Sequence, residues 1–171
     1  MSGGSAHIAE DQGEVVTFLA DPRNHDPAPE RVERIDTHGA MVFLAGENAY
    51  KIKRAVHYSY MDFSTLPRRR AACENEIRVN RANAPQIYLG AVPITRKEDG
   101  GLALGGDGEA VEWAVHMRRF DENAGLDRMA ARGALDRELL ERLPRRIAPP
   151  PEPAPRRPDF DQQPSSTPLQ A

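Results

Sequence analysis

The most constraining stretch of this chain is residues 32–54, where three short strand-like segments follow one another closely. These segments are Val32–Asp36, Met41–Ala45 and Ala49–Arg54, separated by a turn at Thr37–Gly39 and by the tight turn "GEN". Strands joined by such short turns pair as antiparallel hairpins, because a parallel pair needs a crossover of a dozen or more residues. The stretch therefore predicts an antiparallel meander.

A helix is expected after this meander, over about residues 66–82. Ser64 or Thr65 is placed to cap its N-terminus, and Pro67 suits its first turn. The apolar side chains of the segment fall on one narrow stripe at 3.6 residues per turn: Leu66, Cys73, Ile77 and Ala84. A helix with one apolar stripe buries that stripe, so this helix should pack on the sheet.

More strands are expected beyond the helix. "QIYLGAVPIT" is typical of a strand, "RKEDGG" of a hairpin turn and "LAL" of its short partner, while "AVEWAVHMRRF" alternates as a further main strand. The alternation predicts one shared face for Val111, Trp113, Val115 and Met117. Two short helical pieces broken at Gly133 should follow. The fold class is therefore α+β, with a five-stranded antiparallel sheet, one packed helix and short C-terminal helices.

Composition divides the chain into four regions. Residues 1–29 are a polar N-terminal segment, in which "EVVTFLADP" is consistent with either a short helix or a strand. Residues 30–121 carry the strand and helix patterns, and residues 122–143 form a linker and the start of a helical region. Residues 144–171 are rich in proline without apolar periodicity, which predicts a disordered tail.

Several classes of protein are disfavoured by simple counts. No apolar run approaches the ~20 residues of a membrane span, and the N-terminus lacks a signal-peptide pattern. A single cysteine, Cys73, excludes an internal disulfide and a cysteine-cluster metal site. A net charge of -3 gives no general attraction to nucleic acid. We therefore expect a cytoplasmic protein without nucleic-acid or membrane partners.

Two lysines on the third expected strand are the first candidates for chemistry. Lys51 and Lys53 lie two residues apart, so on a strand they share one face with Ala49. Taken alone, lysines at this spacing are typical of the solvent face of an ordinary antiparallel strand. On the following helix, Glu74 has arginines four residues to either side, whereas Glu76 lies beside the apolar stripe. Glu76 should therefore point inward and meet a strand lysine, because a carboxylate at a buried edge needs a partner.

A strand lysine paired with a glutamate of the next helix is also the arrangement that orients the phosphate-binding lysine of kinases. The segments "VFLAGENAYKIKRAV", "DFSTLPRRRAACENEIRVNRANAPQIYLGAVPIT" and "EWAVHMRRFDENAGLDRMAARGAL" together resemble the N-terminal lobe of aminoglycoside phosphotransferase-like kinase domains. The resemblance is nearest to the branch found in large bacterial proteins that also carry a P-loop ATPase domain. It runs from about residue 35 to residue 143 and implies that residues 30–121 form a kinase-like N-lobe.

The resemblance implies ATP as the ligand and assigns roles residue by residue. Lys51 would contact the phosphates, with Lys53 as the less favoured choice, and Glu76 would be the helix partner. The backbone of the linker between lobes would bind adenine, and the linker residues are Met117, Arg118, Arg119 and Phe120. The turn Thr37–Ala40 lies where a loop would cover the phosphates, although it lacks the kinase glycine pattern.

Phosphoryl transfer in this family also needs a second lobe with an "H-G-D" type loop and later magnesium ligands. No histidine of this chain follows the linker, and no "GxxxxGK[ST]" motif occurs, so the catalytic residues and the magnesium ligands are expected to be absent. Two interpretations stay open. One is a truncated or frame-shifted phosphotransferase domain, inactive alone and with an unknown acceptor. The other is a non-enzymatic nucleotide-binding or regulatory module. In either case the exposed lobe face predicts self-association.

Overall fold

The computed structural model describes residues 7–121 and 124–141, with side chains from residue 9 onward. The chain falls into two compact units, Met1–Asp121 and Glu122–Ala171. The proline-rich segment 144–171, which we expected to be disordered, lies outside the described residues. The described part of the first unit contains the candidate site and is an α+β structure, as the sequence predicted.

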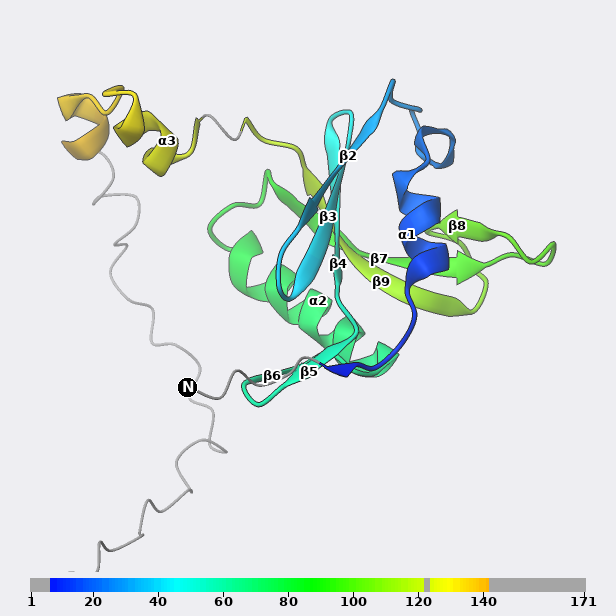
Figure 1. Cartoon of the computed structure of the whole chain (residues 1–171). Coiled ribbons are helices and arrows are strands. Elements are labelled where there is room, and N and C mark those ends of the chain that lie inside the picture. Colours follow the sequence, from blue (N-terminus) through cyan, green and yellow to red (C-terminus); the bar gives the residue numbers. More distant parts are fainter. Residues whose placement is uncertain (1–6, 122–123, 142–171) are drawn as a thin grey trace, which may run out of the picture. The chain divides into compact units, whose positions relative to one another are not determined.

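The elements of the first unit are shown in Figure 1. In chain order they are β1 (His7–Ile8), α1 (Gly13–Ala20), a 3-10 helix (Pro22–Asn24), β2 (Val32–Asp36), β3 (Ala40–Ala45), β4 (Asn48–Lys53), β5 (Val56–Tyr58), β6 (Met61–Asp62), α2 (Leu66–Arg81), β7 (Tyr88–Arg96), β8 (Leu102–Leu104) and β9 (Ala110–Arg118). The segment "EVVTFLADP", for which helix and strand were both open, forms α1 and the start of the 3-10 helix.

The main sheet is antiparallel and has six described strands in the order β2-β3-β4-β9-β7-β8. The prediction of five strands was wrong, because it did not count the short hairpin partner "LAL", which forms a sixth strand, β8. The predicted hairpin itself is present. Strand β8 pairs with β7 from Ile94 opposite Leu104 to Arg96 opposite Leu102. A second sheet, β1-β5-β6, was not predicted, since strands of two or three residues carry no measurable alternation.

Two helices pack on opposite faces of the main sheet (Figure 1). On one face, Val15 and Leu19 of α1 pack with residues of β3 and β4 such as Phe43 and Ile52. On the other face, Cys73 of α2 packs with a smaller cluster that is formed by Leu44, Ala49, Val115 and Met117. The sheet is therefore covered on both sides, and α1 belongs to the same core as the predicted strands.

One predicted face assignment on β9 was wrong. Trp113, Val115 and Met117 do pack on the α2 side, but Val111 packs with the α1-side core. The pairing of β7 with β9 shifts between Ile94 and Thr95, which leaves Val111 as an extra residue. Such an irregularity reverses the side-chain alternation that the sequence pattern assumes.

Helix α2 begins and ends close to the predicted limits. Thr65 occupies the N-cap position with extended backbone, and Pro67 lies in the first turn, where its missing N–H costs nothing. Arg78 and Arg81 in the last turn face the negative end of the helix dipole. The described part of the second unit contains α3 (Leu126–Ala131) and helical residues 137–141, separated at Gly133 with its φ of 68°. Within the described residues, every helix is too short or too polar to cross a bilayer.

Candidate functional site

The two strand lysines and the helix glutamate meet on the α2 side of the sheet. Lys51 and Lys53 project from β4 toward α2, where they share one carboxylate. The Nζ atom of Lys51 lies 3.0 Å from Oε1 of Glu76, and Nζ of Lys53 lies 2.5 Å from Oε2. The structure therefore brings together the three residues that the sequence analysis singled out, and both lysines take part.

The two lysines differ in how far they reach solvent. The Lys53 side chain is 10% exposed and lies over the Phe63 ring, with Nζ 5.5 Å from the ring centroid. The Lys51 side chain is 28% exposed. Lys51 therefore has more room than Lys53 to contact a ligand while Lys53 stays against Glu76.

The charge of Glu76 is maintained by these two lysines. Burial by itself raises the pKa of Glu76, but the hydrogen bond from Lys53 and the charges of Lys53 and Lys51 outweigh burial, so the pKa lies below its ordinary value. Glu76 is consequently ionised at neutral pH. Two ammonium groups share one carboxylate, which leaves one positive charge at the site for an anion.

Apolar residues continue from Lys51 toward the edge of the sheet. Lys51 is the cross-strand neighbour of Val42 on β3, and Val42 is the neighbour of Ile35 on β2. Directly opposite residues of adjacent strands share a face, so these side chains lie on the side that carries Lys51. Ile35 is 40% exposed and Val42 is partly buried. An accessible apolar strip therefore adjoins the cationic group, which is the combination that a base and its phosphates require.

The predicted linker continues the sheet instead of leaving it. The amide of Arg118 donates to the carbonyl of Ile87 at 2.8 Å, and the amide of Arg119 donates to the carbonyl of Glu47 at 2.7 Å. These two amides cannot donate to adenine without breaking the sheet. The Phe120 side chain, which follows them, is 56% exposed. Adenine contacts from this segment would therefore use carbonyl oxygens or the backbone of Phe120.

The predicted phosphate-covering turn is closed by its own hydrogen bonds. The amide of Thr37 donates to the carbonyl of Ala40 at 2.9 Å, and the amide of Ala40 donates to the Thr37 hydroxyl at 3.1 Å. The carbonyl of Gly39 accepts from the amide of Arg54 at 3.0 Å. A Cβ at Gly39 would lie only 2.9 Å from Cε of Met61. The turn is thus tied to the residue that follows β4 and lies close to β6, and its Thr37 and Ala40 amides are already engaged.

A buried ion pair that the sequence analysis missed joins α2 to β9. Nε of Arg69 donates to both carboxylate oxygens of Glu112, at 2.9 Å each, and the two side chains are 0% and 1% exposed. Arg69 belongs to the run "RRR", whose composition suggests a solvated surface. It nevertheless lies four residues before Cys73, on the apolar stripe of α2, and this position was the available signal of burial.

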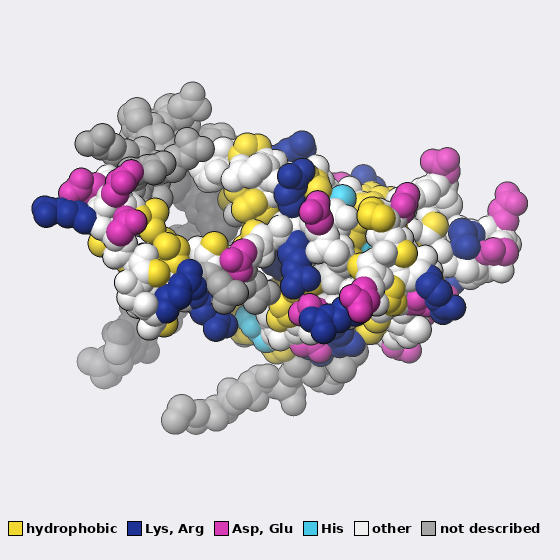
Figure 2. Space-filling view, turned by 90° about the horizontal axis from the view of Figure 1, so that it is seen from above, with side chains coloured by type: hydrophobic (Ala, Val, Ile, Leu, Met, Phe, Trp, Pro, Cys, Tyr) yellow, Lys and Arg dark blue, Asp and Glu magenta, His cyan; other side chains and the backbone are white. Residues whose placement is uncertain are grey.

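Charged side chains elsewhere on this unit are largely paired with opposite charges. Figure 2 shows basic and acidic side chains interspersed over the surface in view. Examples are the pairs Arg34–Asp36 at 2.7 Å and Arg70–Glu74 at 2.8 Å. The second pair confirms that Glu74 belongs to the solvated face of α2. Within the described residues, no cluster of three or more His, Cys, Asp or Glu side chains is arranged to hold a metal ion.

Comparison with known proteins yields relatives without an assigned activity. The chain is 36% identical over 118 residues to uncharacterized proteins of Mycobacterium bovis and of two strains of Mycobacterium tuberculosis. The aligned region covers 65% of this chain and 22% of each relative. The chain thus spans about a fifth of the length of the curated relatives it matches. No family model and no solved structure matches the chain.

Proposed function

We propose that residues 30–121 form a nucleotide-binding lobe of the kinase-like phosphotransferase type, with ATP as the ligand. The observation that carries this proposal is the ion pair between Lys51 on β4 and Glu76 on α2, at 3.0 Å. In protein kinases a lysine of the third strand, held by a glutamate of the following helix, binds the α- and β-phosphates of ATP. The meander, the helix and the pair occur here in the same order.

In this proposal Lys51 is the phosphate ligand and Lys53 is a positioning residue. Glu76 holds the Lys51 ammonium group by the contact at 3.0 Å, so this group does not have to be ordered when ATP binds. Lys53 keeps a second hydrogen bond to Glu76 at 2.5 Å. Lys53 therefore compensates the buried carboxylate while Lys51 turns toward a phosphate oxygen.

The base would lie on the apolar strip formed by Ile35 and Val42. ATP, when bound, brings the transferable phosphoryl group, and the residues described above supply charge, orientation and an apolar surface. Backbone groups near Phe120 are the proposed hydrogen-bond partners of adenine. The proposal assigns phosphate binding to this chain. Both a phosphotransferase and a non-enzymatic nucleotide-binding module would need this binding.

Thermal unfolding with and without ATP tests the proposal. A ligand that binds the folded state alone at ten times its Kd stabilises that state by about 1.4 kcal/mol. We expect ATP to raise the Tm of the wild-type chain and to leave the Tm of Lys51→Ala unchanged. The matched control is Lys97→Ala, because Lys97 is an exposed lysine outside the site and pairs with Asp99. This control should keep the wild-type shift. A wild-type Tm that does not respond to ATP up to about 10 mM would remove nucleotide binding from the proposal.

A further inference from the structure

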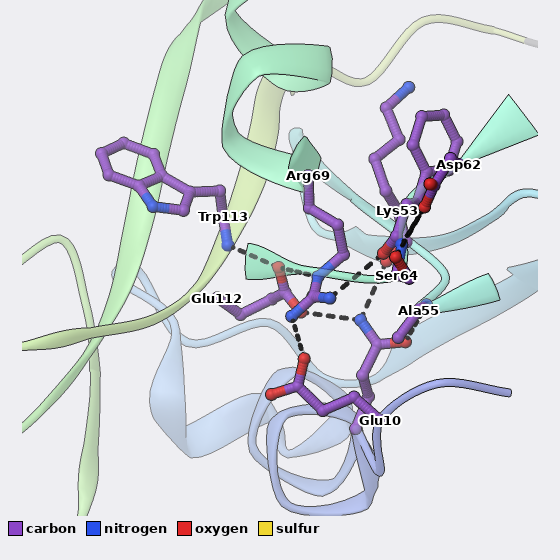
Figure 3. Close-up of polar contacts among 10 residues, drawn as sticks. Glu10, Lys53, Ala55, Asp62, Ser64, Arg69, Glu112 and Trp113 are labelled. Atoms are coloured by element: carbon purple, nitrogen blue, oxygen red, sulfur yellow. Dashed lines mark hydrogen bonds and ion pairs between the residues drawn. The ribbon is translucent and has the colours of Figure 1, made fainter. Parts of the chain in front are cut away.

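The buried pair of Arg69 and Glu112 is part of a larger network that reaches the N-terminal segment (Figure 3). Nη2 of Arg69 donates to Oε2 of Glu10 at 2.8 Å, and Nη1 donates to the carbonyl of Phe63 at 3.2 Å. The backbone amide of Trp113 donates to Oε1 of Glu112 at 2.9 Å. The Arg69 guanidinium thus connects α2 to β9 and to the segment before α1.

Gln12 is the second connection of this network. Its Nε2 atom donates to Oε2 of Glu112 at 2.7 Å and to the carbonyl of Lys53 at 2.8 Å. Its Oε1 atom accepts from the amide of Ala55 at 2.8 Å, and the carbonyl of Ala55 accepts from the amide of Ala9 at 2.8 Å. One side chain therefore contacts β9, the end of β4 and the residues that lead into β5.

We infer that residues 9–12 act as a clamp that sets the position of α2 over β4, with Glu10, Gln12, Arg69 and Glu112 as positioning residues for the lysine–glutamate pair. Arg69 and Glu76 lie two turns apart on one face of α2, about 10 Å along its axis. A displacement of Arg69 therefore moves Glu76. Gln12 holds the backbone of Lys53, so the clamp contacts both elements that carry the pair.

The clamp concerns the position of α2, and only its effect on ATP rests on the proposed function. Trp113 is the single tryptophan of the chain, and it reports this position directly. Cζ of Arg70, the neighbour of Arg69 on α2, lies 4.6 Å from the centroid of the Trp113 ring. A guanidinium stacked on an indole affects its environment, so movement of α2 away from β9 changes the tryptophan emission.

Four variants separate a clamp from an ordinary stabilising contact. Gln12→Ala removes the central bridge, and Glu10→Ala removes the partly exposed end of the network. Glu10→Gln keeps an acceptor for Arg69 and serves as the conservative variant. The matched control is Glu14→Ala, since Glu14 of α1 pairs with Arg96 of β7 on the surface.

The test compares three quantities at a temperature where every variant is folded: the Trp113 emission, the hydrogen exchange of the α2 amides and the affinity for ATP. Gln12→Ala and Glu10→Ala should shift the emission and raise α2 exchange about tenfold. They should also weaken ATP binding about fivefold. Glu10→Gln and Glu14→Ala should match the wild type in all three measurements.

The clamp is refuted if Gln12→Ala and Glu10→Ala lower the Tm while Trp113 emission and α2 exchange stay at the values of Glu14→Ala. If Gln12→Ala does not fold, Glu10→Ala decides the question alone, because the Glu10 side chain is 49% exposed and tolerates truncation. If the wild type does not bind ATP but the emission and exchange change as expected, the clamp stands and the proposed function fails.

Discussion

Replacing Glu112 with leucine should be among the most destabilising single changes in the first unit. The variant removes both acceptors of Arg69 Nε and the acceptors of Gln12 and of the Trp113 amide. Burial alone lowers the pKa of Arg69, but hydrogen bonds and attraction from Glu112 and Glu10 raise it, so the guanidinium stays charged. Arg69 then keeps only the half-exposed Glu10 as a charged partner. The loss should therefore lie toward the lower end of the about 3–5 kcal/mol that breaking a buried pair from one side costs.

The double variant Arg69→Met, Glu112→Leu gives the sharper result. Replacing both partners of a buried pair with apolar residues of similar volume removes the unpaired charge, so this variant should regain part of the loss. The Trp113 amide and Gln12 Nε2 still lack the Glu112 acceptor in this variant. We expect it to lie within about 2 kcal/mol of the wild type. Equilibrium unfolding in urea, followed by circular dichroism and by Trp113 fluorescence, measures both values.

The matched control for this cycle is Glu74→Leu, which removes a carboxylate from an exposed pair on the same helix. Its free energy of unfolding should equal that of the wild type within error, since exposed pairs contribute little. A cost below about 1 kcal/mol for Glu112→Leu would refute this reasoning, because it would show that Glu10 or water compensates Arg69 without Glu112. A double variant no more stable than Glu112→Leu would refute the reasoning in a second way.

Three further predictions concern titratable groups. Burial raises the pKa of Cys73 to about 12, so its thiol should resist alkylation at about pH 8 in the native protein and react only after unfolding; rapid native labelling would contradict its burial. The pKa of Glu76 is depressed from 4.5, so the stability that the ionised carboxylate contributes is complete above that pH and is lost as the pH falls. Glu76→Gln should therefore be less stable than the wild type at neutral pH and should lose less stability on acidification. An acid dependence equal to that of the wild type would count against the ion pair. Burial lowers the pKa of His116 from 6.5, so its NMR titration midpoint should lie below that value. Protonation of His116 should destabilise the fold as the pH falls from 6.5. A midpoint at or above 6.5 would show that the ring is accessible to water.

The features predicted well from the sequence are those with a local signal. The limits of β2 match the prediction, and those of β3 and β4 differ from it by single residues at their ends, because alternation and tight turns define short antiparallel strands. The meeting of Lys51 with Glu76 also followed from local rules, namely strand parity and the position of Glu76 beside the apolar stripe. That both lysines contact one carboxylate could not be predicted, because it depends on how α2 crosses β4.

The features that were missed depend on contacts between distant parts of the chain. Glu10 and Gln12 lie in a segment that composition describes as polar and separate, yet they contact Arg69 and Glu112 far along the sequence. No periodicity links such residues. The hairpin of β7 and β8 was predicted from its turn, but three residues were too few to be counted as a strand of the sheet.

The central claim is that Lys51 binds a phosphate of ATP, and the difference between ATP and adenosine affinities tests it most directly. Isothermal titration of both ligands should show that the wild type prefers ATP about tenfold or more, as a charge-assisted hydrogen bond to phosphate requires. Lys51→Met should abolish this preference without changing adenosine affinity, and Lys97→Met should retain it. An ATP preference that survives in Lys51→Met would contradict the assignment.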